Sequence, residues 1–389
     1  MHIEELQEAV AAGGFDGWLF FDHHRRDPLA YRILGIPGDI EATRRWYYFV
    51  PAHGEPRKLV HRIENRTLDN LPGRKHIYSS WVDQHAQLKE LLCGCSKIAM
   101  QYSADCAIPY ISLVDAGTIE LVRAAGVEVV SSAGLVQEFE ARWTAGQLDA
   151  HLEAGKLVDQ VRRDAFDLIG ERLRIGEPVT EYDVQQFILS RFSQSFLFTG
   201  HGPIVAANQH ASDPHYEPAY GTSATIKTGD LVLIDLWAKL IQPEAVYYDV
   251  TWTGYCGENI PSRIQNIFEI VRDARRKTVR FVIEKTSRNE QFAGFEVDDV
   301  ARGHIKGHGH GEWFFHRTGH SIGTEVHGTG ANMDNLESHD DRLVIPNTCF
   351  SIEPGIYLGD FGVRSEVNVY VGKGSARVTG EEQDQLIRI

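Results

Sequence analysis

The chain has 389 residues, of which 42% are hydrophobic and 24% are charged, and this size and composition are typical of a soluble globular protein with two domains. Its 54 acidic and 39 basic residues give a formal net charge of −15. This charge argues against a general nucleic-acid binder, which would carry a basic face, and against docking on an anionic lipid surface. No apolar run reaches 18 residues, so the sequence predicts no membrane span.

The N-terminal segment and the cysteines point to a cytoplasmic protein. The segment MHIEELQEAVAAGG predicts an amphipathic helix that ends at two glycines, and it lacks the basic and apolar regions of a signal peptide. The five cysteines are odd in number and scattered, so a disulfide framework is not expected. Cys93 and Cys95 form a C-x-C pair, which we interpret as two ordinary reduced thiols.

The first part of the chain alternates short apolar strands with helical stretches, which predicts an α/β domain with a mixed sheet. The predicted strands lie at 17–21, 44–50, 58–63 and 97–102. Helical patterns occur in DPLAYRILG and in HAQLKELL. We place the domain boundary near residue 144, which gives predicted domains of 1–144 and 145–389.

The second predicted domain has helices and strands in separate blocks, which indicates an α+β fold. The expected helices cover 148–173, 180–192, 261–286 and 296–307, and Thr180 is a plausible N-cap with Asp183 three residues later. The expected strands lie in GPIVAAN, DLVLIDLWAKL, AVYYDVTWTGY, TCFSIEPGIYL and GVRSEVNVYVG.

Two aspartates follow apolar or aromatic residues within these strands. Asp235 comes directly after LVLI, and Asp249 opens VTWTGY 14 residues later. A buried carboxylate needs a partner, and a metal ion is a common one. If the two strands form a hairpin through IQPEA, both carboxylates come to one place. Each aspartate taken alone is equally well explained as a turn cap or an ordinary hairpin residue.

Six histidines crowd the stretch from residue 304 to residue 327. We expect the first three, at 304, 308 and 310, to belong to a solvated glycine-rich loop. His320 differs because it lies in GHSIG, where flanking glycines let the backbone approach a ligand closely. A neutral imidazole is a frequent ligand for transition metals.

Two glutamates complete the set of candidate ligands. Glu353 ends an apolar run, and Pro354 and Gly355 then force a turn. Glu366 lies two residues after Arg364, which predicts that both side chains share one face of a strand and that the arginine holds a carboxylate. The alternative for either glutamate is a structural ion pair.

The five candidate ligands together indicate a metal site more strongly than any one of them does alone. Four carboxylates that converge with an imidazole would repel one another unless cations separate them. Mixed oxygen and nitrogen ligands suit manganese, cobalt or zinc. Two such ions can share a bridging hydroxide, which is a common hydrolytic nucleophile.

The ordered motifs IDLWAKL, YYDVTWTG, HRTGHSIGTEVHG, FSIEPGIY and GVRSEVNV resemble those of the pita-bread metallopeptidases. This family contains methionine aminopeptidase, aminopeptidase P, prolidase and creatinase. The resemblance covers roughly residues 150–385. The first domain is similar to the creatinase-type N-terminal domain, which favours the aminopeptidase P and prolidase branch.

The resemblance implies a role for each candidate ligand. Asp235 would chelate one metal ion. Asp249 and Glu366 would bridge both ions. His320 and Glu353 would complete the second ion, and Glu353 could also act as a general acid and base.

Four further residues acquire roles from the same resemblance. His327 would contact the scissile carbonyl and stabilise the tetrahedral intermediate. His316 and His215 would lie on the substrate side of the site. Arg364 would orient the ligand carboxylates. Two divalent ions, manganese before cobalt or zinc, and a homodimer are also implied.

The resemblance implies a hydrolase that cleaves the bond before proline in X-Pro peptides or dipeptides. Three departures from the family pattern bear on its substrate: the 14-residue spacing of the aspartates, Trp252 in place of a frequent arginine, and Gly328 in place of a frequent acidic residue. We expect the longer spacing and Trp252 to lie beside the pocket. The alternatives are a pita-bread enzyme for a small non-peptide substrate, either a C–N hydrolase, a cyclic-solute hydrolase or a dimethylsulfoniopropionate lyase, and a non-enzymatic binding module.

Overall fold

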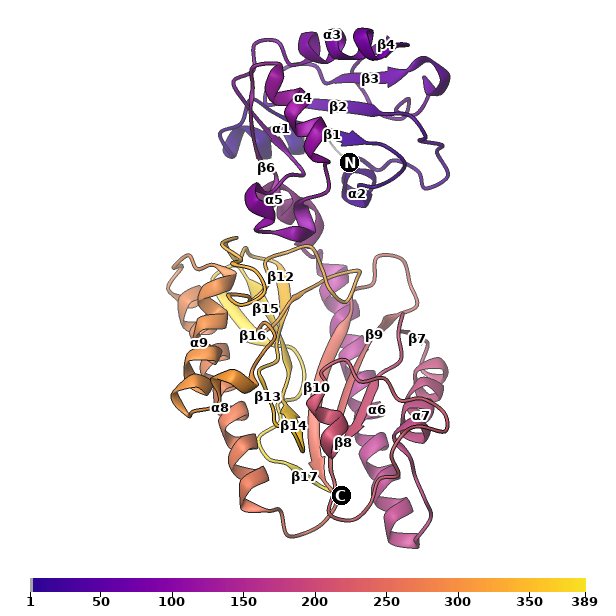
Figure 1. Cartoon of the computed structure of the whole chain (residues 1–389), viewed down its shortest axis with the longest axis vertical. Coiled ribbons are helices and arrows are strands. Elements are labelled where there is room, and N and C mark those ends of the chain that lie inside the picture. Colours follow the sequence, from indigo (N-terminus) through magenta and orange to yellow (C-terminus); the bar gives the residue numbers. More distant parts are fainter. Residues whose placement is uncertain (1–2) are drawn as a thin grey trace. The chain divides into compact units, whose positions relative to one another are not determined.

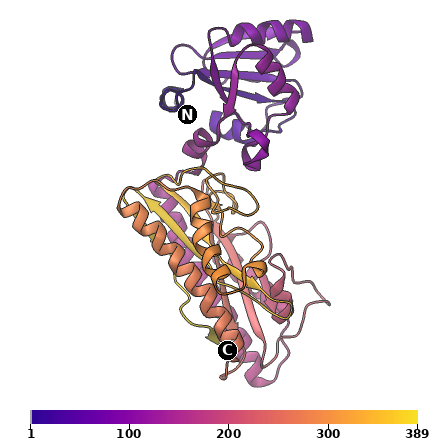
Figure 2. The same cartoon turned by 60° about the vertical axis from the view of Figure 1, so that its left-hand side comes forward.

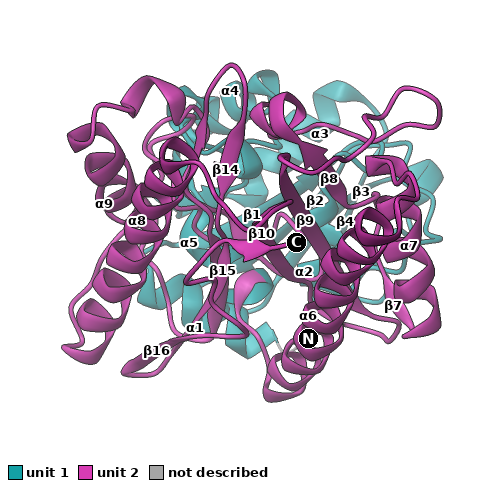
Figure 3. Ribbon diagram, turned by 90° about the horizontal axis from the view of Figure 1, so that it is seen from below, with its two compact units in different colours: residues 1–140 teal, residues 141–389 magenta. Residues whose placement is uncertain are grey.

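A computed structural model of the protein describes residues 3–389, and the chain forms two compact units. Unit 1 contains the residues up to 140, and unit 2 contains 141–389 (Figure 3). This division falls a few residues before the boundary expected at residue 144. No helix within residues 3–389 is both long and apolar enough to cross a bilayer.

Unit 1 is built on a mixed six-stranded sheet in the order β4-β3-β2-β1-β5-β6. Its helices are α1 (Ile3–Ala12), α2 (Pro28–Leu34), α3 (Trp81–Leu91), α4 (Ala116–Ala124) and α5 (Ala133–Val136). Its strands are β1 (Gly17–Asp22), β2 (Trp46–Pro51), β3 (Arg57–His61), β4 (Arg74–Tyr78), β5 (Lys97–Met100) and β6 (Glu128–Ser131). Strand β2 is antiparallel to both of its neighbours, and the other pairs are parallel. The predicted α/β domain with a mixed sheet is therefore confirmed.

Both faces of this sheet are buried. Side chains alternate along a strand, so Trp18 and Phe20 of β1 join one hydrophobic core, whereas Leu19 and Phe21 join the other. The predicted N-terminal helix is present as α1, although its first two residues lie outside the described part of the chain. The sequence did not predict β4 and β6, which form the two edges of the sheet.

Unit 2 has four helices and three small sheets. Its helices are α6 (Ala145–Ile175), α7 (Glu181–Gln194), α8 (Ser262–Ser287) and α9 (Gly294–Gly307). Its strands are β7 (Leu197–Phe198), β8 (Ile204–Ala207), β9 (Leu231–Leu240), β10 (Tyr248–Tyr255), β11 (Ser321–Ile322), β12 (Thr348–Ile352), β13 (Gly355–Tyr357), β14 (Gly362–Arg364), β15 (Val367–Gly372), β16 (Ser375–Val378) and β17 (Ile387–Arg388). The four helices and the α+β class agree with the sequence prediction.

The helices of unit 2 enclose the sheets from two sides (Figures 1 and 2). Helices α6 and α7 pack on the sheet that contains β9 and β10, and α8 and α9 pack on the sheet β11-β12-β15-β16. The two sheets meet where β10 lies beside β15, because the backbone N–H of Asp249 donates to Oδ1 of Asn368 at 3.1 Å. The candidate metal ligands are placed along this junction.

Strands β9 and β10 form the predicted antiparallel hairpin. Thr251 lies opposite Asp235, and Asp249 lies opposite Trp237, so the two aspartates project from the same face as diagonal neighbours. Residues 241–247 connect the strands, and Glu244 takes a left-handed conformation with φ 59°. The two strands pair without a break from Tyr248 to Tyr255 despite the 14-residue spacing of the aspartates.

Two predicted single strands are each broken in two. The TCFSIEPGIYL segment forms β12 and β13, which are separated at Glu353, and the GVRSEVNVYVG segment forms β14 and β15, which are separated at Glu366. The expectation that Arg364 and Glu366 share one strand face is therefore wrong. Strand β14 ends at Arg364, and β15 begins only after Glu366.

The caps and helices follow their local signals closely. The Thr180 hydroxyl accepts a hydrogen bond from the backbone N–H of Asp183, and the Asp183 carboxylate accepts one from the backbone N–H of Thr180, so α7 begins with a capping box. The expectation of a glycine-rich loop is wrong for His304, because this residue lies within the last turns of α9. All five cysteines are free thiols, as expected.

We predict that two glycine substitutions within α6 change the free energy of unfolding in opposite directions. A Cβ atom on Gly155 would lie only 2.8 Å from the Tyr248 ring of β10, whereas a Cβ atom on Gly170 would meet its nearest neighbour at 3.5 Å. Gly155→Ala should lower the free energy of unfolding by about 1–3 kcal/mol through overpacking. Gly170→Ala should raise it by about 1 kcal/mol through helix propensity. Urea denaturation of both variants tests this, and an equal gain in both would show that α6 does not pack tightly on β10.

Candidate metal centre

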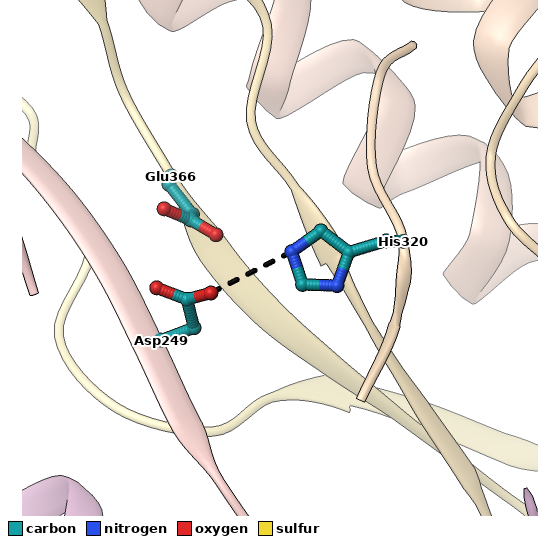
Figure 4. A group of neighbouring side chains, drawn as sticks. All are labelled: Asp249, His320 and Glu366. Atoms are coloured by element: carbon teal, nitrogen blue, oxygen red, sulfur yellow. Dashed lines mark ion pairs between the residues drawn. The ribbon is translucent and has the colours of Figure 1, made fainter. Parts of the chain in front are cut away.

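Three of the five predicted ligands converge directly. Ligand atoms of Asp249, His320 and Glu366 all lie within 4.8 Å of one another, and all three residues are buried (Figure 4). They come from β10, from the residue before β11, and from the break between β14 and β15. Segments far apart in the sequence therefore place two carboxylates and an imidazole at one point.

Glu353 joins this group through His320. The His320 Nε2 atom lies 3.4 Å from Oε1 of Glu353 and 3.5 Å from Oδ2 of Asp249. Ser351 fixes both residues, because its hydroxyl donates to Oε1 of Glu353 at 3.0 Å and accepts the backbone N–H of His320 at 2.9 Å. The position of Glu353 at the strand break thus turns its carboxylate towards the imidazole.

Asp235 is held next to the group by Arg364. Nη2 of this arginine lies 2.5 Å from Oδ2 of Asp235, and its Nε donates to the Thr251 hydroxyl at 2.9 Å. The same hydroxyl donates to Oε2 of Glu366 at 2.7 Å. Arg364 and Thr251 therefore link the carboxylates of Asp235 and Glu366.

His320 presents its Nε2 atom to the carboxylates. Its Nδ1 lies 3.1 Å from the backbone carbonyl oxygen of Ser321, an acceptor that can bind only an N–H. The hydrogen-bond geometry thus assigns the proton of the neutral ring to Nδ1. In this neutral form, Nε2 would offer its lone pair to a metal ion, whereas in the protonated ring Nε2 faces Asp249 and Glu353 as a donor.

Three buried carboxylate oxygens have no hydrogen-bond partner. They are Oδ1 of Asp235, Oδ1 of Asp249 and Oε1 of Glu366. Buried polar atoms are almost always paired, and a buried anionic oxygen without a partner is especially unfavourable. A divalent cation supplies the missing interaction, so the residues present fit a metal ion.

The pKa shifts of the buried carboxyl groups also indicate that the site requires cations. Burial raises the pKa of Asp235 to about 7, although Arg364 opposes the shift. Burial and the charge of Asp249 raise the pKa of Glu366. Burial also raises the pKa of Asp249, against its interaction with His320. Without cations, the site therefore resists holding all its carboxylates ionised.

The pKa values of Glu353 and His320 shift in the directions that favour the charged form of each group. Burial alone would raise the pKa of Glu353, but the charges on His320, His316 and Arg364 lower it. Burial alone would lower the pKa of His320, but its hydrogen bond to Asp249 and the charge of Glu353 raise it. The ion pairing of these residues partly offsets their burial.

The other predicted site histidines lie at different distances from this group. The His327 ring is 4.4 Å from the His320 ring, centroid to centroid, in an edge-on arrangement. The His316 Nε2 atom lies 2.6 Å from the Tyr357 hydroxyl oxygen, and that hydroxyl also accepts from Nη1 of Arg364 at 3.2 Å. His215 lies on an exposed loop, and its charge contributes to the lowered pKa of His327.

Sequence reasoning missed three side chains that hold this arrangement together. Thr251 bridges Arg364 and Glu366, Ser351 bridges His320 and Glu353, and Tyr357 bridges His316 and Arg364. Thr251 could have been found, since it lies two residues after Asp249 and shares its strand face. Ser351 and Tyr357 carry no comparable signal.

Trp252 does not lie beside the metal ligands, which corrects our expectation. Strand alternation turns it to the face opposite Asp249 and Thr251, where it packs against the core formed by α6 and α7. The guanidinium carbon of Arg162 lies 3.5 Å from its ring centroid. Trp252 therefore belongs to the packing layer behind the hairpin.

Gly328, the third departure from the family pattern, is tightly enclosed. A Cβ atom at this position would lie 2.9 Å from Oγ of Ser321 and 3.1 Å from the backbone nitrogen of Gly323. An acidic side chain could enter here only if these neighbours moved. The loop that carries His327 is therefore shaped around a glycine.

Comparison with known sequences gives a consistent result. Residues 149–373 match the family described as metallopeptidase family M24. An Xaa-Pro dipeptidase of Lactobacillus delbrueckii subsp. lactis is 33% identical over 205 residues, covering 52% of this chain and 50% of the relative. An Xaa-Pro dipeptidase of Pyrococcus horikoshii is 32% identical over 186 residues, which cover 47% of this chain and 48% of the relative. The chain spans about half the length of these curated relatives.

Solved structures match over nearly the whole chain. A dipeptidase from Mycobacterium ulcerans superposes with a TM-score of 0.71 at 23% identity, covering 100% of this chain and 96% of that one. Escherichia coli aminopeptidase P superposes with a TM-score of 0.57 at 14% identity, and the match covers 97% of this chain and 94% of that one. These likenesses confirm the predicted pita-bread fold and its preceding α/β domain.

We predict that metal ions stabilise the protein more strongly as the pH rises. The pKa of Asp235 in the metal-free fold, about 7, lies above the ordinary value of 3.8, so this fold binds more protons than the unfolded chain between these pH values. Its stability should therefore fall as the pH rises from about 4 to about 7. Metal ligands must be deprotonated, so the affinity for metal should rise over the same range.

Thermal unfolding at pH 5.5, 6.5 and 7.5, with EDTA or with excess manganese, measures this effect. The difference in Tm between the two conditions should widen with pH. A difference that stays constant or shrinks would contradict the assignment of the buried carboxylates as ligands.

Proposed function

The chain belongs to metallopeptidase family M24, and from this premise we propose that it cleaves the bond before proline in X-Pro peptides or dipeptides with the aid of two divalent metal ions. One observation carries the proposal. Unpaired carboxylate oxygens of Asp235, Asp249 and Glu366 are buried beside the imidazole of His320, where only cations complete their interactions. Manganese is the proposed metal, with cobalt or zinc as alternatives.

We assign the ligands as the family pattern implies. Asp235 would hold one ion, Asp249 and Glu366 would hold both, and His320 and Glu353 would complete the second. When bound, the two ions would polarise the scissile carbonyl and lower the pKa of a water molecule that serves as nucleophile. Arg364 keeps Asp235 oriented and offsets part of the negative charge.

Glu353 is suited to move the proton. Its side chain is 15% exposed, compared with 6% for Asp249 and 5% for His320, so it is the most accessible of these three groups. Only one of its oxygens is engaged by Ser351. We propose that Glu353 accepts a proton from the attacking water and delivers it to the leaving nitrogen.

His327 is suited to stabilise the oxyanion as a neutral donor. The charge of the adjacent His320 and burial lower the pKa of His327 to about 3, so its ring is uncharged near neutral pH. A neutral imidazole can still donate a hydrogen bond to a developing oxyanion. His316, whose pKa burial lowers to about 4, and His215 would line the substrate side.

A second candidate function follows from Gly328. Family members often carry an acidic residue beside the histidine equivalent to His327, and the loop here has no room for one. Position 328 therefore contributes no negative charge beside His327. A small non-peptide substrate with a hydrolysable C–N bond is the alternative that this difference favours.

The homodimer and the cytoplasmic location remain predictions.

The test is a matrix of metals and substrates. The chelated protein, reloaded with manganese, cobalt or zinc, is assayed on X-Pro dipeptides, X-Pro tripeptides, matched peptides without proline, and small amides. We expect manganese-dependent release from X-Pro substrates alone. Release from small amides without release from X-Pro peptides would replace the proposal by the alternative, and no release from any substrate would contradict both.

His327→Ala tests the assigned oxyanion role. We expect kcat to fall by roughly 10²–10³-fold, as for loss of one oxyanion donor. Metal content should not change, because His327 is not a proposed ligand. His308→Ala is the matched control, since it removes an exposed histidine at the end of α9 and should keep full activity. Equal activity of the two variants would exclude the role of His327.

A further inference from the structure

Unit 1 contains a cavity that the proposed function does not use. Its volume is about 550 Å³, and all of its lining residues belong to unit 1. The lining includes three arginines and two histidines: Arg26, Arg44, Arg45, His23 and His61. This concentration of basic groups is unexpected in a chain with a formal net charge of −15.

The sheet gathers these residues at one end. Strand β1 ends at Asp22, directly opposite the first residue of β2, Trp46, so the segments around His23 and Arg45 are neighbours. Strand β3 ends at His61, which pairs with the last residue of β4, Tyr78. Residues from five separate segments therefore line the cavity, and four of these segments adjoin or belong to strands of the sheet.

The arginines have no carboxylate partner. No ion pair joins Arg26, Arg44 or Arg45 to an acidic residue within residues 3–389. Three carboxylates lie nearby, and Asp115 itself lines the cavity, but each is hydrogen-bonded to neutral groups and none is paired with a guanidinium group. Asp22 accepts the backbone N–H groups of Arg25, Arg26 and Asp27, Glu64 accepts those of Thr43 and Arg44, and Asp115 accepts the N–H and hydroxyl of Thr118.

Two further observations indicate a ligand. Gln84 lines the cavity and is fully buried, but one end of its amide has no hydrogen-bond partner, while the other end bonds the Tyr47 hydroxyl. Burial and the charges of His24, Arg26 and Arg45 lower the pKa of His23. The unpaired guanidinium groups favour an anionic occupant, and the free Oε1 of Gln84 can accept a hydrogen bond from a hydroxyl or other donor group of the same occupant.

We propose that this cavity binds a small polyanion whose phosphate or carboxylate groups pair with the three arginines. Guanidinium groups form charge-assisted, often bidentate hydrogen bonds with both kinds of anion, which makes arginine the preferred residue for such sites. The free Oε1 of Gln84 is an acceptor, so it can bind a hydroxyl group of the ligand and not an ionised oxygen. The site is independent of the metal centre, since unit 1 contributes none of the proposed metal ligands.

The probes are inorganic phosphate and succinate, titrated by calorimetry into the full-length, metal-loaded protein at low ionic strength. We expect saturable binding of at least one of them. Binding of phosphate alone identifies a phosphoryl ligand, and binding of succinate alone identifies a carboxylate ligand. Added salt should weaken binding, because the arginines are partly exposed to solvent.

Two variants locate the binding. Arg45→Gln and Arg26→Gln should each raise Kd by about tenfold or more, the effect of losing one charge-assisted pair. Arg74→Gln is the control, because it removes an exposed arginine at the opposite end of β4 from the cavity. Thermal unfolding confirms that all three variants fold. No saturable binding up to about 10 mM, or equal affinity in wild type and both cavity variants, would overturn the proposal.

Discussion

The arrangement of unit 2 depends on one constraint: four carboxylates and an imidazole are buried together at the junction of two sheets. Burial and mutual repulsion oppose the ionised state of Asp235, Asp249 and Glu366, and the buried cation of Arg364 compensates only part of this charge. A fold that carried such a cluster without further cations would lose stability at neutral pH. Divalent ions bound to this cluster would therefore help to hold the two sheets together, in addition to their proposed part in catalysis.

The fold meets this constraint by placing ligands where strands pair or end. The β9–β10 hairpin puts two aspartates on one face, and its strands pair without a break from Tyr248 to Tyr255. The glutamates instead lie at breaks, where the backbone leaves one strand and begins another, so their side chains turn out of the sheet towards the hairpin. Thr251, Ser351 and Tyr357 then fix the side chains of the site through hydrogen bonds.

Local signals in the sequence predicted much of this architecture. The hairpin, the capping box at Thr180 and the four long helices all follow from periodicity and turn residues. The breaks at Glu353 and Glu366 were harder to predict, because apolar residues on both sides read as continuous strands. Trp252 was expected beside the pocket because it stands where the family often has arginine, but strand alternation turns it to the face of β10 opposite Asp249. The edge strands β4 and β6 lacked a clear alternating pattern, and the charged cavity of unit 1 arises only when distant strand ends meet.

The most direct test of the central claim is a crystal structure of the manganese-loaded protein with anomalous diffraction data. We predict two anomalous peaks about 3.5–4 Å apart, the separation typical of two-metal sites. The carboxylates of Asp249 and Glu366 should contact both peaks, Asp235 one, and His320 and Glu353 the other. The account is contradicted if no peak appears among these residues, or if a single peak persists at saturating manganese.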